Sequence, residues 1–200
     1  MIKVYGDMQS GNWYKIKLLL NFLAIEHDWI HIDILAGETH TEEFMKMNPN
    51  TRIPVLDLGN GDHLAESNAI LNYLADGSAF LPEDRLLRAR VLQWQFFEQY
   101  SHEPYIATAR FIRKYLGLPK EREQEYQAKQ EGGHKALLIM EQVLAQSDFL
   151  VGDCLTIADI SLYAYTHVSH EGGFELKSYP SIQRWINSIQ QRPDYIGMNS

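Results

Sequence analysis

Hydrophobic residues in the first 75 positions follow strand spacing in some segments and helix spacing in others. Residues 2–5 form a short apolar run that favours a strand. Residues 13–24 favour a helix, because four apolar residues recur on one face, namely Ile16, Leu19, Leu20 and Leu23. In residues 30–34, isoleucine alternates with His31 and Asp33, which is strand spacing. We therefore expect a β-α-β unit whose parallel strands are joined by a right-handed crossover.

The segments that follow predict further strands and a second helix. Residues 41–47 are expected to form one or two helical turns. The sequence RIPVLDLGNGDHLAES, residues 52–67, indicates two strands joined at Asn60–Gly61, a dipeptide typical of hairpin turns. Residues 68–75 return to helical spacing. The expected order is therefore β-α-β, a short helix, and then β-β-α.

Beyond residue 77 the pattern predicts helices and no strand. Residues 78–84 form a connector, and helical periodicity then recurs over residues 85–116, 121–144, 156–168 and 180–193. Pro104 is expected to kink or divide the first of these helices, and Gly132–Gly133 is expected to weaken the second. The predicted fold is an α/β domain over residues 1–77, a linker, and an all-α domain over residues 85–200.

Composition and charge narrow the classes of function. The chain has a formal net charge of −8, and no cluster of Lys and Arg suggests a nucleic-acid or anionic-membrane surface. A single cysteine, Cys154, excludes an internal disulfide and fits a reducing compartment. The N-terminus lacks the apolar core of a signal peptide, and no apolar run approaches the length of a membrane span. We therefore expect a cytoplasmic protein that binds neither nucleic acid nor membrane.

Two sets of residues in the second half of the chain are better explained by a role in folding than by a catalytic or metal-binding role. The eight histidines offer no convincing metal set, because His167 and His170 share a helix face without a third ligand at suitable spacing. We therefore expect no metal. Thr156 and Asp159 have the spacing of a capping box, in which each side chain bonds the other residue's backbone N–H.

Two further motifs carry candidate binding chemistry, each beside a plainer interpretation. Pro54 could be an edge-strand proline, or it could follow a cis bond that leaves the Ile53 backbone free for a ligand. Ser67 could simply cap a helix. Alternatively, Ser67 and the positive end of that helix could bind a carboxylate, while Glu66 pairs with an ammonium. Together these groups would hold the α-amino acid end of a ligand.

The sequence resembles the cytosolic glutathione transferases, of the bacterial kind related to the theta and beta classes. The likeness runs nearly end to end and rests on SGNWYK, NPNTRIPVL, ESNAIL and FLVGDCLTIADISLY. It implies a thioredoxin-like N-terminal domain with a cis-proline, followed by an all-helical domain. It also implies detoxification chemistry, with glutathione as co-substrate and no other cofactor. A homodimer is implied too, formed by the last helix of the first domain and the long helix from Arg85.

In thioredoxin-like folds the turn after the first strand carries the reactive group, often two cysteines. Here that turn reads Ser10-Gly11-Asn12-Trp13, so the thiol must come with the ligand. Ser10 matches the family's serine and Asn12 is the second candidate donor to a thiolate, which the adjacent helix N-terminus would also favour. Trp13, expected to contact glutathione, stands where related bacterial sequences often have cysteine, which leaves the handling of disulfides open.

The resemblance assigns further residues to glutathione. His40 and Arg52 would bind its glycine end, although each could equally be a surface residue. The Ile53 backbone beside Pro54 would pair with the cysteinyl unit, and Glu66 with Ser67 would hold the γ-glutamyl end. The pocket for the electrophile would lie between the domains, and its candidate residues, which could instead be helix packing, are Met8, Trp13, His102, Tyr105 and Arg110.

The expected function is conjugation of the glutathione thiolate to a small hydrophobic electrophile. In a close variant, the same thiolate attacks oxygen or sulfur, giving a glutathione-dependent peroxidase or disulfide reductase. The alternative from another class is a non-catalytic binding or regulatory protein, since the same fold can serve different functions.

Overall fold

A computed structural model describes residues 1–200 and divides into two compact units. The first comprises Met1–Asp76 with Pro193–Ser200, and the second comprises Gly77–Arg192. The sequence pattern places residues 193–200 in the helical domain, whereas the structure groups them with the first unit.

The tail is bound by polar side chains of helix α1, which spans Gly11–Phe22. The Tyr14 hydroxyl donates to the Ile196 carbonyl oxygen at 2.8 Å. Lys17 Nζ donates to the carbonyl oxygens of Met198 and Ser200 at 3.3 and 2.7 Å. These donors lie within one helical turn of each other, so one face of α1 satisfies successive carbonyls of the tail.

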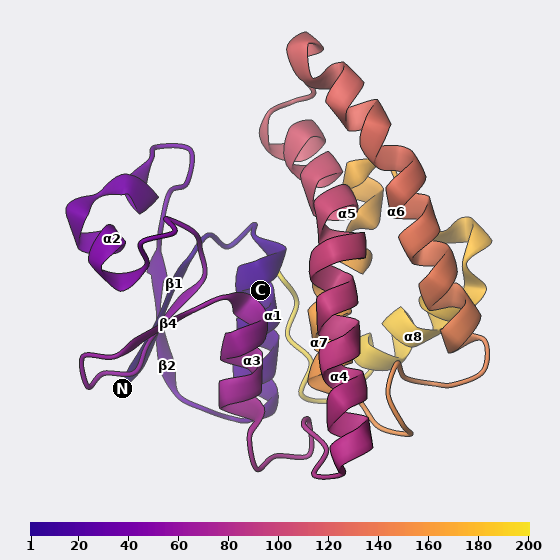
Figure 1. Cartoon of the computed structure of the whole chain (residues 1–200), viewed down its shortest axis with the longest axis horizontal. Helices are drawn as coiled ribbons and strands as arrows, with labels where there is room; N and C mark the ends of the chain where they lie inside the picture. The colour runs from indigo at the N-terminus through magenta and orange to yellow at the C-terminus, as the bar shows by residue number, and fades with distance from the viewer. The chain divides into compact units, whose positions relative to one another are not determined.

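The first unit is built on a four-stranded sheet, as the pattern predicts (Figure 1). Its strands are β1 Ile2–Gly6, β2 His27–His31, β3 Val55–Asp57 and β4 His63–Ala65. Their order is β2-β1-β3-β4; β1 and β2 are parallel, and the other neighbours are antiparallel. Helices α1 and α3, Ser67–Ala75, pack against each other on one face of the sheet (Figure 1). The short helix α2 spans Glu42–Met47.

The second strand begins and ends earlier than the alternating isoleucines predict. It spans His27–His31 rather than residues 30–34. Asp33 ends it, because its Oδ1 accepts the backbone N–H groups of Leu35 and Ala36, both at 2.9 Å. A carboxylate that bonds the backbone two and three residues ahead turns the chain out of the sheet.

The second unit is all-helical, which confirms the predicted fold class. Its α-helices are α4 Arg85–Phe97, α5 Glu103–Arg110, α6 Glu123–Leu144, α7 Ile157–Thr166 and α8 Pro180–Gln190. Pro104 divides the first long segment as predicted: it lies in the first turn of α5, after a π-helical turn over Glu98–His102. Proline lacks the N–H that would continue the regular ladder, so the helix restarts there. No helix of the chain is both long and apolar enough to span a membrane.

The helix α6 runs without interruption through Gly132 and Gly133, the pair expected to weaken it. A Cβ on Gly132 would lie 2.2 Å from the Tyr105 ring, and one on Gly133 would lie 2.3 Å from the Phe174 ring. Both aromatic rings therefore pack directly on the helix backbone. Glycine occurs here because of this close approach, which offsets its low helix propensity.

The predicted capping box at the start of α7 is present and belongs to a larger buried network. The backbone N–H of Thr156 donates to Asp159 Oδ2 at 2.9 Å. Asp159 Oδ1 also accepts from the Leu150 backbone N–H at 2.9 Å and the Trp185 indole N–H at 3.0 Å. Burial raises the pKa of Asp159 to about 6, although these hydrogen bonds oppose the shift.

Candidate functional site

The strand register brings three of the predicted segments to one edge of the sheet. Tyr5 of β1 pairs with Val55 of β3, and Val55 pairs with Ala65 of β4. The chain segments that adjoin this row are therefore neighbours: the turn after β1, the Ile53–Pro54 segment before β3, and the Glu66–Ser67 segment after β4. Two helices, α1 and α3, begin at this same edge.

Ser10 lies in the turn after β1 and forms the N-cap of α1. Its Oγ accepts the backbone N–H of Trp13 at 3.4 Å, and its side chain is largely buried. The first turn of α1 contains no acidic residue. The positive end of this helix is therefore not neutralised by its own side chains and can attract an anion.

Asn12 and Ser67 meet across the two helix N-termini. The Ser67 hydroxyl donates to Asn12 Oδ1 at 3.2 Å. Lys15 joins them: its Nζ donates to Asn12 Oδ1 at 2.7 Å and to Ser67 Oγ at 3.2 Å. Sequence reasoning missed Lys15, because a lysine in an amphipathic helix is usually solvated. Lys17, two residues further along α1, is also buried. The burial of both lysines depends on tertiary contacts, which hydrophobic spacing does not predict.

Glu66 occupies the N-cap position of α3, so Ser67 is the first helical residue rather than the cap. The plainer interpretation of Ser67 as a capping residue is therefore wrong. Glu66 has φ 68° and ψ 110°, a sparsely populated conformation for a residue with a side chain, and makes no side-chain capping bond. Backbone strain of this kind is concentrated at functional sites. Glu66 is exposed, whereas the next residue, Ser67, is buried.

The Ile53–Pro54 bond is cis, so the edge-strand interpretation of Pro54 is wrong. The proline precedes β3, which lies in the interior of the sheet between β1 and β4. Asn48, which sequence reasoning did not single out, holds the approach to this bond. Its side-chain amide donates to the Arg52 carbonyl oxygen at 2.8 Å, and its Oδ1 accepts the Asn50 backbone N–H at 3.0 Å. The only sequence signal was its place at the start of the NPNTRIPVL motif.

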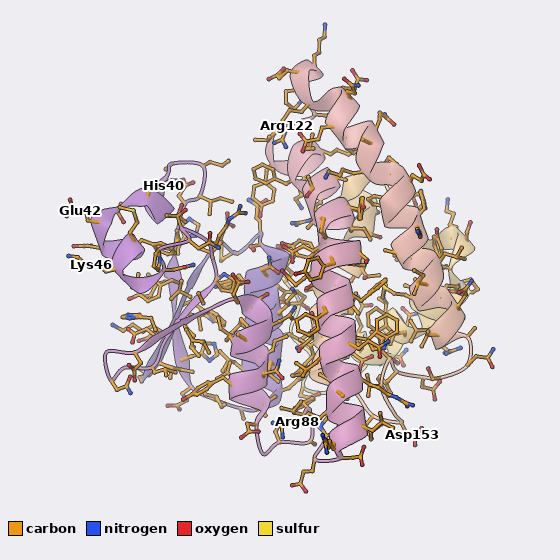
Figure 2. All side chains as sticks on the ribbon, viewed as in Figure 1. His40, Glu42, Lys46, Arg88, Arg122 and Asp153 are labelled. Carbon is orange, nitrogen blue, oxygen red and sulfur yellow. The ribbon has the colours of Figure 1, made fainter.

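The residues predicted for the glycine end lie on the surface of the first unit. His40 and Arg52 are both exposed. His40 ends a short 3-10 helix just before α2, and Figure 2 shows it on the same outer side as Glu42 and Lys46. Their contact with glutathione stays a prediction.

Trp13 is buried against the sheet. Its ring centroid lies 4.4 Å from that of Trp29, and a Cβ on Gly6 would lie 2.1 Å from its ring. The indole N–H is buried and has no hydrogen-bond partner. These contacts give Trp13 a packing role, and the contact with glutathione expected of it remains a prediction.

The residues proposed for the electrophile pocket have different environments within their own units. Met8 is exposed, with 60% of its surface accessible. His102 is buried and its Nε2 lies 2.9 Å from Thr166 Oγ1. Arg110 is also buried, and its Nε lies 2.5 Å from a carboxylate oxygen of Glu171. Tyr105 packs on Gly132 as described above. Their membership of a substrate pocket stays a prediction.

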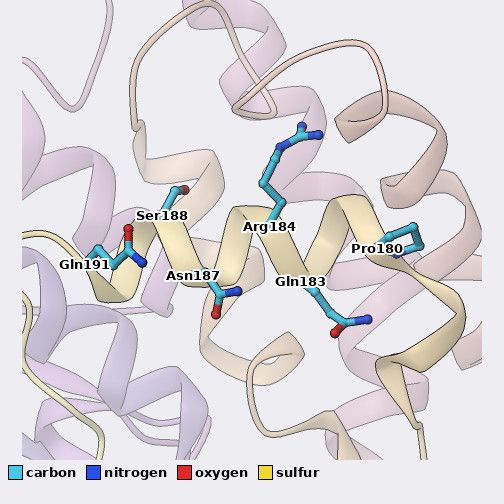
Figure 3. Close-up of a pocket in the computed structure, with 6 residues that line it drawn as sticks. All are labelled: Pro180, Gln183, Arg184, Asn187, Ser188 and Gln191. Carbon is cyan, nitrogen blue, oxygen red and sulfur yellow. The ribbon is translucent and has the colours of Figure 1, made fainter.

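A separate surface hollow of about 500 Å³ lies along α8 in the helical unit. Figure 3 shows its lining, which consists of Pro180, Gln183, Arg184, Asn187, Ser188 and Gln191. Its one charged side chain is committed elsewhere, because Arg184 donates to the carbonyl oxygens of Leu144 and Ser147 at 2.5 and 2.9 Å. The hollow therefore presents amides and a hydroxyl but no reactive group.

Two family models match this chain, and between them they cover most of its length. The model described as the glutathione S-transferase N-terminal domain matches residues 1–76. The model described as the glutathione S-transferase C-terminal domain matches residues 94–193. The first match contains all three segments at the sheet edge, and the second spans most of the helical unit.

Similar proteins agree with these matches. A crystal structure of a glutathione S-transferase from Pseudomonas fluorescens is 58% identical, with a TM-score of 0.98, over 100% of this chain and 99% of its own. The glutathione S-transferase hmp2 of Hypomyces subiculosus is 28% identical over 98% of this chain and 96% of its own. The transcriptional regulator URE2 of Saccharomyces cerevisiae is 27% identical over 96% of this chain, which spans only 66% of that protein.

Proposed function

The chain belongs to the glutathione S-transferase family, and from this premise we propose that it conjugates the thiolate of glutathione to small hydrophobic electrophiles. The meeting of two helix N-termini at one sheet edge, beside Ser10, Asn12, Glu66 and Ser67, carries this proposal. Glutathione is the co-substrate, and the reaction needs no other cofactor.

The γ-glutamyl end of glutathione would bind at the start of α3. This helix has no acidic residue in its first turn, so the N–H groups at its start favour the α-carboxylate, and the Ser67 hydroxyl would turn from Asn12 Oδ1 to donate to it. The exposed Glu66 carboxylate would pair with the α-ammonium. The Ile53 backbone would hold the cysteinyl unit, and His40 with Arg52 would hold the glycine carboxylate. These contacts would bring the thiol to the turn that precedes α1.

Activation of the thiol would come from this turn. A free thiol has a pKa of about 8.5, so only a few per cent is thiolate at neutral pH. Hydrogen bonds from Ser10 and Asn12 to the sulfur, with the positive end of α1, would lower that pKa. Each unit of lowering corresponds to about 1.4 kcal/mol of differential stabilisation. The remaining rate enhancement would come from positioning the electrophile in an apolar pocket.

Two alternatives differ from conjugation in what happens to the bound glutathione thiolate. The turn holds no cysteine, so attack on a peroxide or a disulfide would also begin with the glutathione thiolate and not with a protein thiol. The likeness to the transcriptional regulator URE2 supports a regulatory role as the other alternative. In that role glutathione would bind and not be turned over. We place conjugation first because both family models that match the chain are those of glutathione S-transferases.

We also propose that the protein is a cytoplasmic homodimer. The helix α4 and the turn after it expose a stripe of apolar side chains, Leu92, Phe96 and Tyr100, at positions i, i+4 and i+8. Phe96 is 61% and Tyr100 is 79% accessible. Large exposed apolar side chains along one helix face mark protein contacts, and the family resemblance names a second copy of the chain as the partner.

The test begins with retention on immobilised glutathione and continues with conjugation to an activated aryl halide. Wild type should be retained and should turn over the halide. Ser10→Ala should lower turnover with little loss of retention, whereas Glu66→Ala should lose retention. Ser188→Ala, a matched change on α8, should behave as wild type. Retention without turnover of the halide, a peroxide or a disulfide would favour the regulatory alternative, and no retention would refute glutathione binding.

A further inference from the structure

Lys15 is a fully buried lysine in the second turn of α1, with 0% of its surface accessible. Lysine is almost never fully buried unless its charge has partners. Moving an ammonium out of water is unfavourable even after the protein relaxes. The hydrogen-bond partners of the Lys15 ammonium therefore indicate what this buried cation does in the protein.

The Lys15 ammonium contacts both segments that the proposed function assigns to glutathione. Its Nζ lies 2.7 Å from Asn12 Oδ1, in the turn expected to bind the thiol. The same Nζ lies 3.2 Å from Ser67 Oγ, at the helix start expected to bind the γ-glutamyl carboxylate. The Ser67 hydroxyl closes the triangle by donating to Asn12 Oδ1 at 3.2 Å. One buried cation thus forms hydrogen bonds to both parts of the proposed site, the turn before α1 and the start of α3.

These bonds fix the orientation of the Asn12 amide. An amide oxygen only accepts hydrogen bonds, and the amide nitrogen only donates them. Two donors converge on Oδ1. When the Ser67 hydroxyl turns to a bound carboxylate, the charged donor of Lys15 remains on Oδ1, and a charge-assisted bond is roughly twice as strong as a neutral one. A flip of the amide would place its N–H groups against the Lys15 ammonium. The donor end of Asn12 is therefore held at the corner of the amide opposite Lys15.

We propose that Lys15 is a positioning residue for thiolate formation, which acts by locking the Asn12 amide with its N–H donors directed to the sulfur of bound glutathione. This inference rests on the proposed function and adds a residue to it. Lys15 does not touch the sulfur itself. Its contact with Ser67 also makes the geometry of the thiol site depend on the helix that binds the γ-glutamyl end.

The test is the pH titration of the thiol of bound glutathione, followed by the ultraviolet absorbance of the thiolate. Lys15→Met keeps an unbranched apolar chain of similar length and removes the donor. We expect it to raise the pKa of the bound thiol by about one unit, which is about tenfold less thiolate at a pH below both values. Lys15→Gln retains N–H donors without the charge, should give a smaller rise, and serves if the methionine variant does not fold.

Lys17→Met is the matched control. Lys17 lies two residues further along α1, is also buried, and binds carbonyl oxygens of the C-terminal tail instead of the site. Loss of Lys17 should lower the stability of the protein but leave the bound thiol titrating as in wild type. If both variants raise the pKa of the thiol equally, Lys15 acts only through the stability of α1, and the proposal is refuted.

A double-mutant cycle tests whether Lys15 acts through Asn12. Asn12→Ala should raise the pKa of the bound thiol by itself, and adding Lys15→Met should then change it by less than about 0.3 unit, because contacting residues in one network are not additive. Full additivity would show that the Lys15 charge acts directly, which would overturn the positioning role.

Failure of this inference is separate from failure of the proposed function. If wild type binds glutathione with a lowered thiol pKa and Lys15→Met leaves that value unchanged, only the role of Lys15 is refuted. If wild type binds glutathione with an unshifted thiol, or does not bind it, both the inference and the proposed function are refuted.

Discussion

Glu66 is a position where protein stability and glutathione binding are expected to oppose each other. Its backbone has φ 68° and ψ 110°, its side chain is exposed, and it forms no side-chain capping bond to α3. A residue with a Cβ held in such a sparsely populated region costs about 1–3 kcal/mol. Glycine adopts positive φ without this cost. The substitution Glu66→Gly therefore removes strain while losing no capping bond of the folded chain.

The expected size of the effect follows from two opposing contributions. Glycine in place of alanine increases the freedom of the unfolded chain and so lowers stability by about 0.4–1 kcal/mol. Subtracting this from the relieved strain leaves Glu66→Gly more stable than Glu66→Ala by about 1 kcal/mol. In a protein of this size, 1 kcal/mol corresponds to a rise in Tm of about 2–4 °C. Glu66→Ala itself should be close to wild type.

Glutathione binding should change in the opposite direction. A hydrogen bond to a charged group contributes about 1.5–3 kcal/mol, so either variant should bind glutathione at least tenfold more weakly than wild type. Glu66→Gln separates charge from shape, since it keeps the side chain and loses the carboxylate. Urea denaturation measures the stability of each variant, and isothermal titration calorimetry measures its affinity for glutathione.

Two results would refute this reasoning. If Glu66→Gly is no more stable than Glu66→Ala, the backbone at residue 66 is not strained. If Glu66→Gly and Glu66→Ala both bind glutathione as wild type does, the carboxylate is not a ligand, and the strain at this helix start serves another purpose.

Three further predictions concern the helical unit. Burial raises the pKa of Asp159 from 3.8 to about 6, so the folded state holds a proton that the unfolded chain releases between these values. Stability should therefore fall by up to about 3 kcal/mol as pH rises through this window. The urea midpoint of wild type minus that of Asp159→Asn should decrease over the same pH range. A difference that does not change with pH would contradict this prediction. Gly132→Ala should destabilise by about 1–2 kcal/mol in thermal unfolding, because its Cβ would meet the Tyr105 ring, while Glu131→Ala should not; a more stable Gly132→Ala would disprove the packing explanation. Phe96→Glu should convert the proposed dimer into a monomer in analytical ultracentrifugation, and a dimer that stays intact would exclude this face.

The sequence pattern predicted the order of strands and helices because both follow from the burial of periodic apolar residues. Ile16, Leu19 and Leu20 face the core from α1 as their spacing indicates. The boundaries of β2 were wrong, because Asp33 turns the chain through backbone hydrogen bonds that hydrophobic spacing does not encode. The division of the long helix at Pro104 was predictable, since it depends on the chemistry of one residue.

The candidate site could be predicted only in part. Ser10, Asn12 and the Glu66–Ser67 pair were named from motifs, and the strand register places them at one edge of the sheet. Lys15 was missed because its burial depends on α3, which lies more than fifty residues away in the chain. In the same way, the packing of Tyr105 on Gly132 was invisible to a propensity argument, which considers each helix by itself.

The central claim is that this chain binds glutathione and lowers the pKa of its thiol at the turn before α1. The most direct measurement is the thiolate absorbance of glutathione bound to wild type, titrated against pH and compared with Ser10→Ala and Asn12→Ala. We expect the bound thiol to titrate at least one unit below the free value of about 8.5, and at least one substitution to restore most of that difference. A bound thiol that titrates at the free value in wild type would contradict the claim.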